Sequence, residues 1–124
     1  MDPDGTAISF AVIADTHLEA DPGAVANVRA ARMVEAIGRR EPAFVLHLGD
    51  VVHPLPDAAG HAGAAALAHA TFAAFDCPVL YLPGNHDIGD KPLSGQPARR
   101  VRADFLASWR ERYGPDAFVH DVGP

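Results

Sequence analysis

The chain has 124 residues, 48% of them hydrophobic and 21% charged, and its formal net charge is −6. This length allows one domain at most, so we expect a single domain over residues 1–124. The acidic balance disfavours a broad nucleic-acid-binding surface, since phosphate backbones select for stripes of Lys and Arg. Phosphate substrates stay open, because bound divalent cations would invert the local sign of the field.

Membrane insertion and disulfide formation are also disfavoured. No segment approaches the ~18 uninterrupted apolar residues of a membrane span, and the first residues lack the basic and apolar regions of a signal peptide. Cys77 is the only cysteine, so the chain forms no internal disulfide. We therefore expect a soluble, cytoplasmic protein that makes no membrane contact.

Short apolar runs alternate with segments of helical pattern. The runs predict buried strands over residues 8–14, 43–48 and 79–82. Helical spacing predicts helices over residues 24–40 and over about residues 98–113. Between them, an alanine-rich segment predicts a helix that ends at about residue 75. The alternation predicts an α/β fold with βαβαβ order, mostly parallel strands and right-handed crossovers.

Two further segments are less regular. Residues 88–97 show no apolar periodicity, which predicts a loop, and residues 117–120 are expected to begin another strand. Gly114 and Pro115 are expected to end the last helix.

Polar side chains that bind metals follow each of the three predicted strands. Asp15 and His17 follow the first, Asp50 follows the second, and the tetrapeptide Gly84-Asn85-His86-Asp87 follows the third. Asp15, Asp50 and Asn85 are evenly spaced, about one βα unit apart. The motifs therefore fall at the same end of successive strands, where open α/β sheets bind ligands.

The first motif pairs a carboxylate with an imidazole. If the backbone stays extended, Asp15 and His17 point to the same side, and together they suit ions such as Zn, Mn or Fe. The alternative is that Asp15 and Thr16 cap the following helix or turn the chain, which would leave His17 exposed.

The second motif places Asp50 after a glycine. Gly49 allows a sharp turn or a close approach to a ligand, and the two carboxylate oxygens of Asp50 can bridge ions ~3.5–4 Å apart. The alternative is an ordinary turn at the end of a strand. His53, on the same loop, is a candidate contact for a substrate phosphate, whereas His47, inside the strand, is expected to pack or hydrogen-bond within the fold.

The third motif carries the most information. Asn85 can offer an amide oxygen to a metal without adding charge. His86 can donate a proton to a leaving-group oxygen or stabilise charge on a phosphate. Asp87 can orient His86 or its loop through a hydrogen bond. Together the three motifs predict metal-assisted hydrolysis of phosphoesters.

In this order the motifs resemble the calcineurin-like metallophosphoesterase superfamily, over residues 8 to about 90. The resemblance implies the N-terminal half of a four-layer αββα sandwich. It also implies a dinuclear centre of divalent or trivalent ions, which are Mn, Fe, Zn or Mg. A looser similarity, carried by residues 85–92, Trp109 and Tyr113-Gly114, is to cytosolic calcineurin-like phosphoesterase-domain proteins, some of them described as Ser/Thr phosphatases.

The resemblance also assigns roles to single residues. It implies that Asp15 and His17 bind one metal, that Asp50 bridges both metals and that Asn85 binds the other. His86 would contact the phosphate as the catalytic residue. The implied substrate is a phosphomonoester or a phosphodiester, and the motifs do not choose between them.

The superfamily takes further ligands from its C-terminal half, a lone His and then a Gly-His-x-His motif. After His86 the only histidine here is His120. We therefore expect an incomplete N-terminal segment, completed by a C-terminal half or by another chain, with weak metal binding and negligible turnover on its own. The alternative is an inactive fragment or interaction module that retains half of the metal site and whose stability does not respond to chelators.

Overall fold

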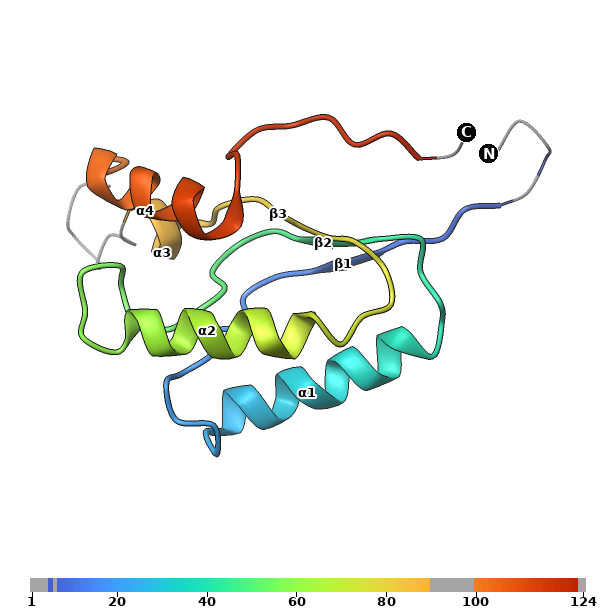
Figure 1. Cartoon of the computed structure of the whole chain (residues 1–124), viewed down its shortest axis with the longest axis horizontal. Helices are drawn as coiled ribbons and strands as arrows, with labels where there is room; N and C mark the ends of the chain where they lie inside the picture. The colour runs from blue at the N-terminus through green and yellow to red at the C-terminus, as the bar shows by residue number, and fades with distance from the viewer. Residues whose placement is uncertain (1–4, 6, 90–99, 123–124) are drawn as a thin grey trace, which may run out of the picture.

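The computed structural model describes residues 5, 7–89 and 100–122, and in it strands and helices alternate as predicted (Figure 1). The three strands are β1 (Ala11–Ile13), β2 (Val45–His47) and β3 (Val79–Tyr81). They form one parallel sheet in the order β1-β2-β3, in which Val12, Leu46 and Leu80 lie in register. The predicted α/β fold with βαβαβ order is confirmed.

Two crossover helices cover one face of this sheet. They are α1 (Val25–Gly38) and α2 (His61–Phe72), which lie side by side below the strands in Figure 1. Each ends somewhat earlier than its sequence pattern predicts. After α2 the chain turns, yet Phe75 beyond it is still buried. No helix among the described residues is long and apolar enough to cross a membrane.

The strands are shorter than the apolar runs that predict them. Pairing continues a little past β1 and β2, since Leu48 N–H donates to the Ile13 carbonyl over 2.8 Å. The ladder then stops because Asp15 and Gly49 adopt left-handed backbone conformations, with φ of 54° and 95°. The chain leaves the sheet at the residues that begin the candidate site.

The core fills the space between the sheet and the two crossover helices. Side chains on the inner face of β1 and β2 alternate with outward ones, as strand geometry requires. The buried apolar residues that β1, β2 and the two helices contribute to the core include Ile13, Val45, Ala30, Val34, Ala64, Ala68 and Phe72. On the opposite face of the sheet Phe10, Val12 and Leu48 stay 54%, 51% and 44% exposed.

Two helices follow β3. The four-residue α3 (Asn85–Ile88) was not predicted, because one turn is too short to show a period, and α4 (Ala103–Tyr113) packs against it. Phe105 and Trp109 bury one side of α4. The helix predicted from about residue 98 begins only at Ala103, since residues 100–102 are not helical. Ile88, the first residue of the predicted loop, belongs to α3. Residues 98–99 of the predicted helix and 90–97 of the predicted loop lie outside the described residues. Gly114, with φ of 99°, follows the last helical residue as predicted.

The strand predicted at residues 117–120 is wrong. This segment runs beyond α4 without a backbone hydrogen bond to the other described residues, and Val119 is 88% exposed. Its contact with the sheet is made by side chains, with the His120 ring 4.9 Å from that of Phe44. An apolar run becomes a strand only where a neighbouring edge pairs with its backbone, and that pairing is missing here.

Candidate metal centre

The loops after β1 and β2 are held together by four backbone hydrogen bonds. Asp15 N–H donates to Gly49 O, and His17 N–H donates to Asp50 O over 3.1 Å. Leu18 N–H donates to Val51 O, and His53 N–H donates to Leu18 O. Leu18 also forms a parallel bridge with Val52. Because Leu18 and Val52 are fully buried, they anchor the loops, whose polar residues stand at the carboxyl edge of the sheet.

The first motif is not extended, contrary to the assumption under which its side chains were expected to point the same way. Asp15 and His17 have φ of 54° and 44°, and Asp50 has φ of 51°. Asp and His are among the residues that adopt this region most readily, at a cost of order 1–3 kcal/mol each. The hydrogen bonds to the neighbouring loop hold these conformations.

The side chains of Asp15, His17 and Asp50 nevertheless converge. His17 Nε2 lies 3.9 Å from Asp15 Oδ1 and 3.7 Å from Asp50 Oδ2, and one ligand atom from each residue falls within 4.8 Å of the others. These separations are too long for hydrogen bonds. They suit atoms that share one ion at about 2.0–2.2 Å from each. The donor set therefore fits a metal.

The alternatives for the first motif are partly excluded. α1 is preceded by Ala24 as its cap residue, without a side-chain cap, so Asp15 and Thr16 do not cap it. His17 is half-buried, with 35% of its side chain exposed. The backbone of the first motif therefore turns, as the alternative expects, but the His17 side chain is not left fully exposed.

Two glycines let the second and third motifs touch. A Cβ on Gly49 would lie 1.9 Å from Gly84 N, and a Cβ on Gly84 would lie 2.2 Å from Asp50 Oδ1. Gly49 is therefore required for close approach to the third motif. This approach lets Asp50 Oδ1 accept a hydrogen bond of 2.9 Å from His86 N–H.

Asp87 is buried beneath both loops. Its carboxylate accepts hydrogen bonds from the backbone N–H groups of Gly84 (2.8 Å), Asp50 (2.6 Å) and Val51 (3.3 Å). Burial raises the pKa of Asp87, against the lowering effect of these bonds. Of the two predicted roles, the described contacts match orientation of the loop rather than of the His86 ring.

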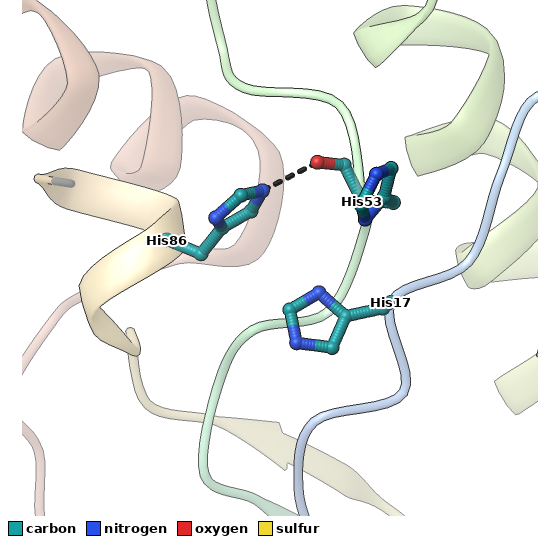
Figure 2. Close-up of side chains that lie close together, drawn as sticks. All are labelled: His17, His53 and His86. Carbon is teal, nitrogen blue, oxygen red and sulfur yellow. Dashed lines mark hydrogen bonds between the residues drawn. The ribbon is translucent and has the colours of Figure 1, made fainter. Parts of the chain in front are cut away.

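The remaining predicted site residues border this cluster. His53 and His86 stand near His17, and the His86 ring Nε2 donates to the backbone carbonyl of His53 (Figure 2). Asn85 begins α3 and is exposed beside His86. The roles assigned to these residues stay predictions.

The model of the calcineurin-like phosphoesterase family matches residues 8–122. The chain belongs to this family. The match includes all three motifs and extends beyond the region that carried the resemblance, which is thereby confirmed. No curated protein matches the chain significantly. Family membership indicates metal-dependent hydrolysis of phosphoesters, and the two acidic groups with His17 supply a fitting donor set.

In this member of the family, the sequence motifs did not single out Thr16. Its hydroxyl donates to Val51 O and lies 2.9 Å from His47 Nε2, while Gly49 N–H donates to His47 Nδ1. His47 is fully buried, and desolvation lowers its pKa to about 4 although the Asp15 charge opposes this. The predicted structural role of His47 is confirmed. The available signal for Thr16 was its position between two candidate ligands.

A surface pocket of about 410 Å³ opens beside the first motif. It is lined by Asp15, His17 and, from α1, Arg29 and Met33. A larger cavity of about 630 Å³ lies between the ends of α1 and α2 and contains none of the predicted site residues. Of these two pockets, the smaller one adjoins the candidate ligands.

Proposed function

We propose that this chain supplies part of a dinuclear centre that hydrolyses phosphomonoesters or phosphodiesters. The convergence of Asp15, His17 and Asp50 at the carboxyl edge of the sheet is the observation that supports it most. When bound, the ions would act as Lewis acids on the phosphoryl group and stabilise its developing negative charge.

Four residues of the chain would bind the two ions. Asp15, His17 and Asp50 would hold one ion, and Asp50 Oδ2 is the oxygen that lies 3.7 Å from His17 Nε2. Asp50 Oδ1 accepts the His86 N–H, and the Asp50 carboxylate would hold the other ion as well. Asn85 would hold that second ion with its amide oxygen.

His86 is the proton donor for the leaving group. Its Nε2 donates to the His53 carbonyl, so Nε2 carries the hydrogen and the carbonyl orients it. In its protonated form the ring would pass this hydrogen from Nε2 to the leaving oxygen and return to the neutral imidazole. His53 stands next to His86 and contacts the phosphate.

The ligands supplied by the chain are too few for two ions. Asp15, His17, Asp50 and Asn85 make four residues, whereas catalytic zinc needs three protein ligands for each ion and larger ions take more. We propose that further ligands come from a C-terminal half of the same domain or from another chain. On its own, residues 1–124 should bind metal weakly and turn over negligibly.

Calorimetric titration of residues 1–124 with Mn²⁺ tests the site. Wild type should bind weakly and Asp50→Asn should bind at least about tenfold more weakly, while Glu35→Gln, on the exposed side of α1, should match the wild type. Equal Mn²⁺ affinity of the wild type and the two variants would contradict the metal-binding role assigned to Asp50. Hydrolysis is followed with p-nitrophenyl phosphate and its bis-ester, and robust Mn²⁺-dependent turnover would contradict the partial site.

A non-catalytic interaction module is the second candidate, and the exposed apolar face of the sheet favours it, with Phe10 and Val12 about half exposed. Thermal unfolding with Mn²⁺ and with EDTA separates the two functions. A metal at 100 times its Kd stabilises the folded state by about 2.7 kcal/mol, so a metal site predicts a higher Tm with Mn²⁺. The module predicts identical curves.

A further inference from the structure

Three histidine rings meet beside the carboxylates of the candidate centre. His17 comes from the loop after β1, His53 from the loop after β2 and His86 from α3, and one ring nitrogen of each lies within 4.8 Å of the others. Figure 2 shows the three rings around a common space. His17 thus belongs to two groups of potential ligands, one with two carboxylates and one with two imidazoles.

The two nitrogens of His17 face different surroundings. Nε2 is the atom near Asp15 and Asp50. Nδ1 is buried and has no hydrogen-bond partner among the described residues. A buried polar atom without a partner costs about 1–3 kcal/mol, so a cation between the rings would satisfy an atom that the protein leaves unpaired.

His86 faces His53 with Nε2, the nitrogen whose hydrogen goes to the His53 carbonyl (Figure 2). An ion bound at Nε2 would displace this hydrogen, and Nδ1 would then carry the ring proton. His53 itself is exposed, and its ring makes no hydrogen bond to the described residues, which leaves its nitrogens available.

We propose that His17, His53 and His86 form a nitrogen-only metal site beside the carboxylate group. Three imidazoles suit Ni²⁺, Zn²⁺ or Cu²⁺, whereas carboxylates with one imidazole accept Mn²⁺. The two groups share His17 and differ in every other ligand, so they should differ in metal preference. The histidine site requires no catalytic turnover and no residue outside residues 1–124.

The test uses residues 1–124 without a histidine tag, titrated separately with Ni²⁺ and with Mn²⁺ in a calorimeter. His53→Ala should weaken Ni²⁺ binding more than about tenfold and leave Mn²⁺ binding within about twofold. Asp15→Asn should do the reverse. His17→Ala should weaken the binding of both ions. His120→Ala, which removes an exposed histidine outside the group, should change neither.

Far-UV circular dichroism of each variant verifies that it folds, and His53→Ala is the safest variant because the His53 side chain is exposed. Undiminished Ni²⁺ binding in folded His53→Ala overturns the histidine site. So does an equal response of both ions to every variant, since that would indicate one mixed site. Ni²⁺ binding without any Mn²⁺ binding would support the histidine site and count against the proposed hydrolytic centre.

Discussion

The carboxylate of Asp87 accepts a hydrogen bond of 2.6 Å from the backbone N–H of Asp50, although 37 residues separate them. The same carboxylate binds Gly84 N–H in its own loop. Asp87 therefore connects the second and third motifs and sets the position of Asp50 independently of any metal.

Removing the Asp87 carboxylate should destabilise the fold. Asp87→Ala leaves the N–H groups of Gly84, Asp50 and Val51 without partners in a buried place, at about 1–3 kcal/mol for each unsatisfied group, so we expect a loss of about 3 kcal/mol or more in the free energy of unfolding. Urea denaturation measures it. Glu35→Gln, which breaks an exposed pair with Arg39, should stay within about 0.5 kcal/mol of the wild type. Similar losses in both variants would contradict the role of Asp87.

The contact between the two glycines should tolerate no side chain. Gly49→Ala places a methyl group on the Gly84 backbone at a residue with φ of 95°, and we expect a loss of more than about 3 kcal/mol or no folded protein. Gly38→Ala is the matched control, because its Cβ would meet nothing within 4 Å. That change, at the end of α1, should be neutral or stabilise by up to about 1 kcal/mol. Equal urea midpoints for the two variants would exclude the close contact.

His47 should make stability fall in mild acid. Its pKa is about 4 in the folded state and 6.5 when unfolded, so between these values the unfolded chain binds more protons and stability rises with pH. The contribution is complete above pH 6.5 and is lost as the pH falls to about 4, and it amounts to about 3 kcal/mol. Urea denaturation at several pH values measures the slope. His47→Gln should flatten it, and an unchanged slope would contradict a neutral, buried His47.

The Tyr113 hydroxyl should contribute little to stability. It is buried without a hydrogen-bond partner among the described residues, and burial raises its pKa. Tyr113→Phe removes an unsatisfied group and should be neutral or stabilise the fold by about 1 kcal/mol. Trp109→Ala, one turn earlier, removes a buried indole and should cost about 3–5 kcal/mol. Urea unfolding compares the two variants, and a marked loss in Tyr113→Phe would reveal a partner for the hydroxyl.

Much of this protein follows from the sequence by itself. The apolar runs before Asp15, Asp50 and Gly84 determined three parallel strands and placed the candidate ligands at one edge of the sheet. Hydrophobic periodicity is a local property, and strand ends in a parallel sheet meet by topology, so neither required knowledge of distant contacts. The order of the three motifs was also sufficient to indicate the family.

Only the tertiary structure decided how the motif residues are held. The left-handed backbone of Asp15 and His17 depends on hydrogen bonds to the neighbouring loop, and the need for Gly49 arises from its contact with Gly84. The bonds accepted by Asp87 and the meeting of His17 with His53 and His86 join segments far apart in the chain. Residues 117–120 show the converse, an apolar run whose backbone pairs with no strand of the described sheet. Contacts of this kind leave no periodic trace in a sequence, because their geometry exists only after the loops have packed.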